Sequence, residues 1–207
     1  MPQLRQLLGK ERILMNSQKG LKWMELFNQK VQDNKALLIE LDTPIGDSDH
    51  GSNMSRGMQH VMDALNSQTP ETFADLLKVV AMQLISKVGG ASGPLYGSAF
   101  LGMSKAAQQD ASIAEVVKEG LAGIQKRGKA ERGEKTMVDV WGPVADALAE
   151  NSLTEEAIKA AVTATKDIKA SKGRASYVGD RSIGHIDPGS YSSGLLFEAM
   201  LEAGVSE

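Results

Sequence analysis

The chain has 207 residues, of which 42% are hydrophobic, 24% charged and only 4% aromatic, with a net charge of −3 and no cysteine. This length and balance favour one domain with a full core, and the weak charge gives no bulk attraction to nucleic acid or to an anionic membrane. The lack of cysteine excludes disulfides, thiolate metal sites and a cysteine nucleophile. Because the N-terminus lacks a secretory apolar segment and no apolar run could cross a bilayer, we expect a cytoplasmic protein without nucleic-acid or membrane partners.

Apolar periodicity and helix caps predict an all-α fold. Alanine, leucine, methionine, lysine, glutamine and glutamate dominate the composition, and all of them favour helix. No segment alternates convincingly as a strand would. We expect about eight helices in one domain that spans residues 1–207, and they cover residues 20–41, 50–65, 69–88, 92–108, 112–125, 136–149, 154–171 and 189–203.

Caps and turn residues set the boundaries of these helices. Thr69 followed by Pro70 predicts the start of the third helix, and Ser112 with Glu115 forms a capping-box pattern at the fifth. Residues 1–18 could form either a short helix or an accessory arm. Two long loops, 126–135 and 172–188, remain between helices, and long loops in compact domains often carry function.

Three aspartates, Asp42, Asp47 and Asp49, lie within eight residues around Pro44 and Gly46. Carboxylates this close repel one another unless a cation or a proton compensates them, and hard oxygen ligands suit Mg²⁺ or Ca²⁺. The loop is therefore a candidate metal site. A solvated acidic turn is the ordinary alternative, because aspartate, glycine, proline and serine are common turn residues.

An EF-hand calcium loop is excluded on its spacing. Counted from Asp47, the twelfth position is Met58, where a bidentate glutamate is required, and the glycine position falls on Ser52. His50 follows the acid cluster directly, and with three carboxylates available it is better suited to hydrogen bonding than to metal ligation. Asn53, one helical turn later, would point the same way.

Three further helix entrances carry residues that suit phosphate binding. Gly89–Gly97 contains Ser92 at a predicted helix start, Lys135 precedes Thr136 at another, and Asp187–Gly189 opens the last helix. Free backbone N–H groups and the positive end of a helix bind anions, although each motif alone is also an ordinary cap or turn. If the helices alternate in direction, alternate entrances share one end of the bundle. Metal-binding carboxylates and phosphate-binding N–H groups would then meet there, which indicates a Mg–nucleotide site.

Several ordered blocks resemble the nucleotide-binding L subunits of dihydroxyacetone kinases over roughly residues 20–203. The blocks that carry the resemblance are Leu41-Asp42 with 45–54, Val88–Gly97, 127–130, Lys135–Met137 with Asp139, 172–177 and Arg181–Gly189. The resemblance implies an eight-helix antiparallel up-and-down barrel with nucleotide bound at one end.

The resemblance also assigns residues to the site. It implies that Asp42, Asp47 and Asp49 hold two Mg²⁺ ions on the phosphates of ADP or ATP, so that no side chain acts as a nucleophile. The residues that it places around the nucleotide are His50, Gly51, Ser52, Asn53, Ala91, Ser92, Gly128, Met137, Arg174, Asp187, Pro188 and Gly189.

A free-standing L-type chain points to the split form of this family. In that form, the resemblance implies, a phosphorylated M subunit of the phosphotransferase system recharges bound ADP, and L passes the phosphoryl group to dihydroxyacetone on a K subunit. Two alternatives remain: a non-enzymatic Mg–nucleotide sensor that binds a transcription regulator, and a related kinase domain for another small substrate. Glu134 and Ser190-Tyr191 depart from the usual pattern of the family and leave the shape of the nucleotide end open.

Overall fold

The computed structural model describes residues 2–205, and the side chains from residue 17 onward. Within that range the chain forms α-helices and two short 3₁₀ segments and no strand, which confirms the all-α prediction. The elements are α1 (Pro2–Asp33), α2 (Lys35–Asp42), α3 (His50–Ser67), α4 (Phe73–Lys87), α5 (Ser92–Ala107), α6 (Ile113–Gly128), α7 (Val138–Ala149), α8 (Glu155–Ala164), η1 (Thr165–Asp167), η2 (Arg174–Ser182) and α9 (Pro188–Glu202).

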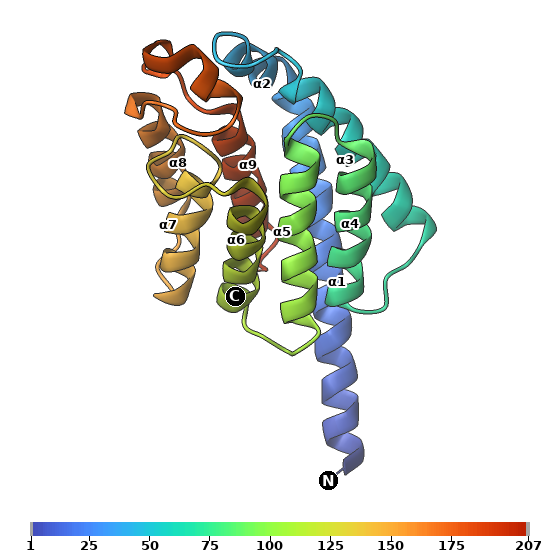
Figure 1. Cartoon of the computed structure of the whole chain (residues 1–207). Helices are drawn as coiled ribbons and strands as arrows, with labels where there is room; N and C mark the ends of the chain where they lie inside the picture. The colour runs from blue at the N-terminus through green and yellow to red at the C-terminus, as the bar shows by residue number, and fades with distance from the viewer. Residues whose placement is uncertain (1, 206–207) are drawn as a thin grey trace.

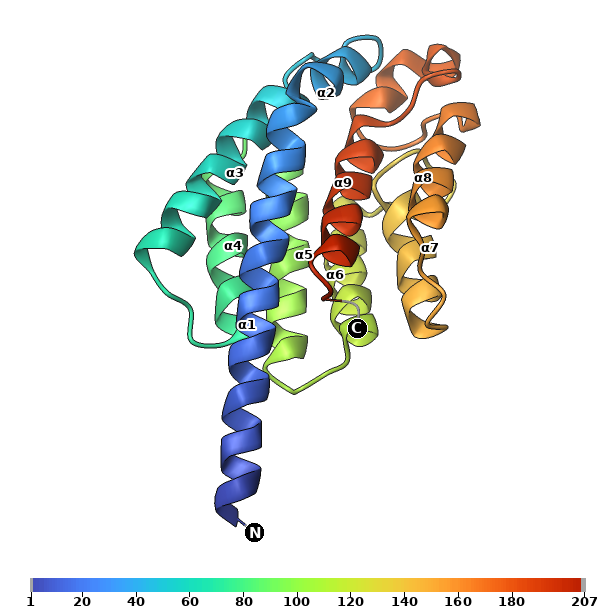
Figure 2. The same ribbon diagram turned by 180° about the vertical axis from the view of Figure 1, so that it is seen from behind.

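The long helices form a closed ring of antiparallel neighbours. α1 packs against α3, each helix from α3 to α9 then packs against the next one, and α9 returns to α1. Figures 1 and 2 show this ring from its two sides, with α2 as a short helix across one end. α2 follows α1 and is not a separate member of the ring. The ring therefore consists of α1 and α3 to α9, the eight helices expected of the up-and-down barrel.

Side chains fill the inside of the ring. Few aromatic residues are available, and most of them are used here: Trp23 packs against Phe100 with ring centroids 6.0 Å apart, and Trp141 meets Phe197 edge-on at 4.8 Å. Aliphatic and methionine side chains of every long helix complete one continuous core. The barrel is therefore a packed bundle, and its functional cavities lie at an end.

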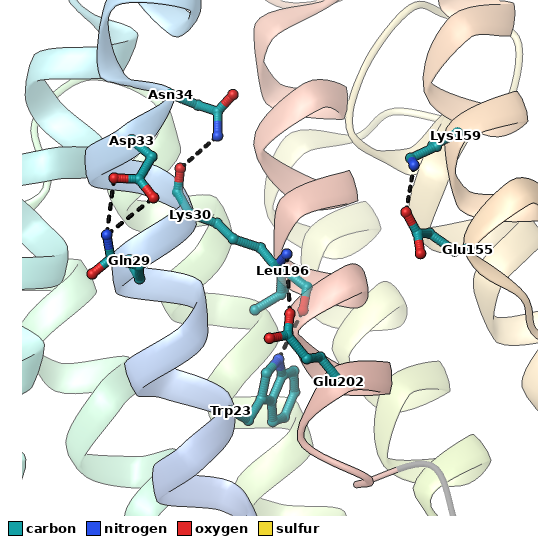
Figure 3. Close-up of polar contacts among 9 residues, drawn as sticks. All are labelled: Trp23, Gln29, Lys30, Asp33, Asn34, Glu155, Lys159, Leu196 and Glu202. Carbon is teal, nitrogen blue, oxygen red and sulfur yellow. Dashed lines mark hydrogen bonds and ion pairs between the residues drawn. The ribbon is translucent and has the colours of Figure 1, made fainter.

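The contact between α1 and α9 closes the ring, and Figure 3 shows the polar part of it. The indole N–H of the fully buried Trp23 donates to the carbonyl of Leu196 at 2.8 Å. Nearer the surface, the ammonium of Lys30 lies 3.2 Å from the Glu202 carboxylate. The first contact combines apolar burial with a buried hydrogen bond, whereas the second is a solvent-screened ion pair.

These two contacts are expected to differ widely in their contribution to stability. Trp23→Ala should lower the free energy of unfolding by about 3–5 kcal/mol, because it empties a large core site. Lys30→Ala should change it by less than about 1 kcal/mol, because exposed ion pairs stabilise little. Urea unfolding followed by circular dichroism measures both. Equal losses in the two variants would contradict this account of how the ring is closed.

Several predicted boundaries were wrong. The helix expected over residues 20–41 breaks at Asn34, whose side-chain amide donates to the Lys30 carbonyl and whose Oδ1 accepts from the Tyr191 hydroxyl. This helix also extends back through residues 2–18, which are helical. The cap of α4 is Thr72 and not Thr69, because the Thr72 hydroxyl accepts from the backbone N–H of Asp75.

The helix expected over 154–171 ends at Ala164, and the loop expected over 172–188 contains the 3₁₀ segment η2. Lys135 explains the early end: its ammonium binds the carbonyls of Thr165 and Ile168, and so organises the chain after α8 as a turn. The Ser112–Glu115 capping box of α6 is present as expected. Within residues 2–205, no helix has the length and apolarity needed to cross a membrane.

Candidate functional site

Four helices begin at the same end of the ring, beside the end of α2. They are α3, α5, α7 and α9, and their alternation follows from the antiparallel order (Figure 1). A cavity of about 140 Å³ lies among these helix starts. The predicted site residues that line it are Asp42, Asp47, Asp49, His50, Ala91, Ser92, Met137, Arg174, Asp187, Pro188 and Gly189.

The acid loop is held in place by Asp42, the buried member of the cluster. Its carboxylate accepts hydrogen bonds from the backbone N–H groups of Asp49, at 2.9 Å, and of His50, at 3.1 Å. Asp42 therefore caps the N-terminus of α3 from seven residues upstream, where a negative charge is favourable. Gly46 must be glycine here, because a Cβ would lie 1.9 Å from Asp42 Oδ1.

One carboxylate oxygen from each of Asp42, Asp47 and Asp49 lies within 4.8 Å of the others. Oxygen-only donors at this density fit a hard divalent cation such as Mg²⁺. Arg174, from the start of η2, forms an ion pair with Asp47, and both side chains line the cavity. Acidic and basic side chains therefore face the same space, as binding of a metal with an anionic ligand requires.

His50 is buried at the edge of this cluster and is not free to bind a metal. Its Nε2 lies 3.0 Å from the Ser192 hydroxyl and its Nδ1 lies 3.0 Å from the Ser92 hydroxyl. Burial lowers the pKa of His50 to about 4, although Asp42 and Asp49 oppose the shift. A neutral imidazole with both nitrogens hydrogen-bonded supports the expected role in hydrogen bonding.

Asp187 opens α9 as its N-cap, and its carboxylate accepts from the backbone N–H of Ser190 at 2.7 Å. Burial raises the pKa of Asp187 to about 6, even though that hydrogen bond and nearby Lys135 favour the charged form. The protonated form is thus favoured in the fold relative to the unfolded chain. His50 and Asp187 therefore have opposite effects on stability in the same range of pH.

The sign of each effect follows from proton linkage. The folded chain holds a proton on Asp187 between pH 4 and 6 that the unfolded chain has lost, so this group costs stability as pH rises. Asp187→Asn removes the cost and keeps a capping side chain. In the ligand-free protein, the variant should therefore gain about 2–3 kcal/mol relative to the parent between pH 4 and 6.5. Urea unfolding across this range measures the difference, and a constant difference would contradict the assignment.

A second cavity of about 400 Å³ adjoins the first and shares with it Gly90, Ala91, Leu95 and Met137. Pro94, Ile124 and Ala130 extend it as a mainly apolar space between α5 and α6. Gly128, another predicted site residue, lies in this second cavity. The two spaces together make one site with a charged compartment and an apolar one.

Gly51, Ser52 and Asn53 line neither of these cavities. Gly51 packs against the start of α2, where a Cβ would lie 2.3 Å from the Lys35 carbonyl. The Asn53 side chain accepts from Arg56 at 2.7 Å and lies beside Gly89, in the loop that leads to α5. Gly51 therefore packs against α2, and Asn53 lies behind the loop that leads to α5.

The sequence predicted a phosphate-binding helix entrance at Lys135, and in the structure the ammonium of this residue is engaged by backbone carbonyls. Its side chain is 1% exposed, and its ammonium donates to the carbonyls of Thr165, at 2.6 Å, of Ile168, at 3.1 Å, and of His185. Lys135 therefore fastens the segment after α8 to the start of α7. No local signal in the sequence could reveal such a role, because the carbonyls of Thr165 and His185 lie 30 and 50 residues away along the chain.

The two departures from the family pattern do not alter the lining of the cavities. Glu134 accepts from the backbone N–H of Glu131 and from the Ser171 hydroxyl, and so orders the loop before Lys135. Tyr191 points away from the site, toward Asn34. Neither residue lines the charged or the apolar cavity.

A model of a known family, described as the DAK2 domain, matches residues 44–202. The chain belongs to this family. The match covers Asp47 and Asp49 of the acid loop, though not Asp42, and the entrances of α3, α5, α7 and α9.

Relatives of similar length are ADP-binding subunits by name, which confirms the resemblance to L subunits. The PEP-dependent dihydroxyacetone kinase 1, ADP-binding subunit DhaL, of Listeria innocua is 54% identical, and the match covers 90% of this chain and 96% of that protein. The corresponding subunit of Escherichia coli is 39% identical, with 82% and 89% covered.

The fold is shared with a solved kinase. The dihydroxyacetone kinase of C. freundii in complex with AMP-PNP and Mg²⁺ matches with a TM-score of 0.73 and 25% identity, over 88% of this chain. This chain covers 33% of that longer protein. The likeness therefore concerns the helical barrel and not the remainder of that kinase.

Proposed function

We propose that this chain is the ADP-binding, phosphoryl-transferring subunit of a PEP-dependent dihydroxyacetone kinase. The observation that carries the proposal is the meeting of three carboxylates, four helix N-termini and an apolar cavity at one end of the ring. Each part matches a part of a Mg–nucleotide: the cation, the phosphates and the base. The names of the full-length relatives support the same assignment.

In this proposal Asp42, Asp47 and Asp49 hold two Mg²⁺ ions. When bound, the ions neutralise charge on the phosphate oxygens as the phosphoryl group moves. Asp42 keeps its two backbone hydrogen bonds, which fix the loop before any ligand arrives. On binding the cation, Asp47 would give up its ion pair with Arg174. The Arg174 guanidinium would then be available to bind phosphate.

The remaining side chains position the nucleotide. The backbone N–H groups at the start of α5 and the Ser92 hydroxyl bind phosphate oxygens, because a helix N-terminus attracts anions. Met137, Leu95 and Pro94 offer an apolar surface to the base in the larger cavity, with Gly128 at its far side. Phosphoryl transfer depends on such positioning and on charge neutralisation, so no nucleophile is required of this chain.

The substrate and the phosphoryl donor would come from partner subunits. We propose that dihydroxyacetone is held by a K subunit and that a phosphorylated M subunit recharges the bound ADP. The chain then acts as a carrier whose bound nucleotide alternates between ADP and ATP. The charged cavity lies at one end of the ring, where partners can reach the phosphates, whereas core side chains fill the inside of the ring.

Native mass spectrometry combined with a reconstituted assay tests this proposal. The purified chain is expected to carry one ADP with two Mg²⁺ ions, and to phosphorylate dihydroxyacetone when K, M and the upstream phosphoryl donors are added. Nucleotide binding without any phosphorylation would instead favour a sensor that binds a transcription regulator. Phosphorylation of another small substrate, with no response to dihydroxyacetone, would favour a different kinase.

A further inference from the structure

A chain of hydrogen bonds runs from the core of the ring to the charged cavity. The Trp141 indole donates to the Ser193 hydroxyl at 3.1 Å, and the Tyr96 hydroxyl lies 3.0 Å from Ser193 and 2.8 Å from Ser192. Ser192 then meets His50 Nε2, and His50 Nδ1 meets Ser92, at 3.0 Å each. We name these six residues, in order, the relay: Trp141, Ser193, Tyr96, Ser192, His50 and Ser92.

Some groups of the relay can only donate a hydrogen bond, and others can either donate or accept. Trp141 can only donate, so the direction of its hydrogen bond is set. The hydroxyl of the buried Tyr96 carries one proton, and the His50 imidazole, whose two nitrogens both meet serine hydroxyls, carries one N–H in its neutral form. Each hydroxyl and the imidazole can therefore donate to either of its neighbours in the relay. The groups bound at the two ends, Trp141 and Ser92, determine which direction is favoured.

In the first arrangement, Ser92 donates its proton to His50, away from the cavity. Ser193 and Ser192 donate to the Gly189 carbonyl, at 2.8 and 3.1 Å, and Tyr96 donates to one of the two serines. Ser192 then has no proton for the imidazole, so His50 carries its proton on Nε2. The bare Nδ1 accepts from Ser92, which presents only lone pairs to the cavity. The lone pairs of the Ser92 oxygen would repel a phosphate oxygen, so this arrangement disfavours phosphate binding.

The other arrangement points outward along its whole length. Ser193 donates to Tyr96, Tyr96 to Ser192, Ser192 to His50 Nε2, and His50 Nδ1–H to Ser92. The Ser92 proton is then free to face an anion in the cavity. Donors aligned in one direction polarise one another, and a hydrogen bond to a charged oxygen is stronger than one to a neutral group.

We propose that the relay holds the outward arrangement in the nucleotide complex, and that Tyr96 and Ser192 are positioning residues for the Ser92–phosphate hydrogen bond. This inference rests on the proposed function, because it takes the anion to be a nucleotide phosphate. It adds that Ser192, which does not line the cavity, acts with Tyr96 to fix the direction of the Ser92 proton. Through the relay, the core of the ring helps to define the phosphate site.

A double-mutant cycle separates positioning from a general structural role. Ser192→Ala should weaken Mg–ADP binding about three- to tenfold, as measured by calorimetry on the metal- and nucleotide-stripped chain. In a chain that already carries Ser92→Ala, the same change should alter the Kd by less than about twofold, because its effect passes through Ser92. Equal losses in both backgrounds would overturn the proposal. Ser104→Ala is the matched control, since Ser104 is also buried but donates to Ala74 outside the relay.

A spectroscopic measurement needs no change in the relay itself. In a chain with His60→Asn and His185→Asn, ¹⁵N NMR reports only the imidazole of His50, and the Mg–ADP complex should show the proton on Nδ1. A proton on Nε2 in that complex would overturn the relay and leave the proposed function standing. Failure of the parent chain to bind Mg–ADP would overturn both.

Discussion

Replacing Asp47 or Asp49 with alanine is expected to reduce phosphoryl transfer at least about a thousandfold while the helical ring stays folded. Neither carboxylate fills a core site: Asp47 is exposed and pairs only with Arg174 among the described residues, and the contribution of Asp49 to the loop is made by its backbone N–H. The side chains should therefore matter to cation binding and very little to packing. This separates them from Asp42.

Asp42→Ala is expected to impair both properties. Its carboxylate caps α3 through two backbone N–H groups, so its loss should cost about 1–2 kcal/mol of stability in addition to activity. Asp63→Ala, on the exposed side of α3, is a control that removes an acid from the same helix outside both cavities. Circular dichroism, Mg²⁺ counting by native mass spectrometry and the reconstituted assay measure the three outcomes. Near-normal turnover by the Asp47 and Asp49 variants would remove the metal cluster from the mechanism.

The sequence predicted the parts of the site that depend on local pattern. Three aspartates around a proline and a glycine, and caps such as Ser112, are short-range signals, and they lie where the helices begin. The alternation of helix directions then brought distant entrances together, as antiparallel packing requires. The roles of the individual site residues toward metal and nucleotide stay predictions.

The parts that were missed depend on tertiary contacts. Ser192 and Ser193 are fully buried on α9 and both meet the Tyr96 hydroxyl, a partner that the sequence does not name. The break at Asn34 likewise depends on Tyr191, 157 residues away. Helix propensity cannot predict contacts of this kind, because it depends only on residues that are close in the sequence.

Lys135→Met is expected to lower the free energy of unfolding by about 3–5 kcal/mol and to weaken nucleotide binding. The ammonium supplies donors to carbonyls on two separate stretches, at Thr165 to Ile168 and at His185. Methionine fills a similar volume but donates nothing, so these buried carbonyls lose their partner. The segment between them carries Arg174, and Asp187 follows it directly. Loosening it should therefore disturb the charged cavity, because Arg174 and Asp187 line that cavity.

Lys129→Met is a closely matched control for this variant. Lys129 and Lys135 both adopt left-handed backbone angles, with φ of 51° and 61°, so methionine meets the same backbone cost at each. Lys129 is exposed, and its variant should change stability by less than about 0.5 kcal/mol. Hydrogen exchange adds the location: residues 165–187 should lose protection in the Lys135 variant only. If both variants unfold alike, or if exchange rises evenly around the ring, Lys135 does not fasten this segment, and the position of Arg174 and Asp187 must depend on other contacts.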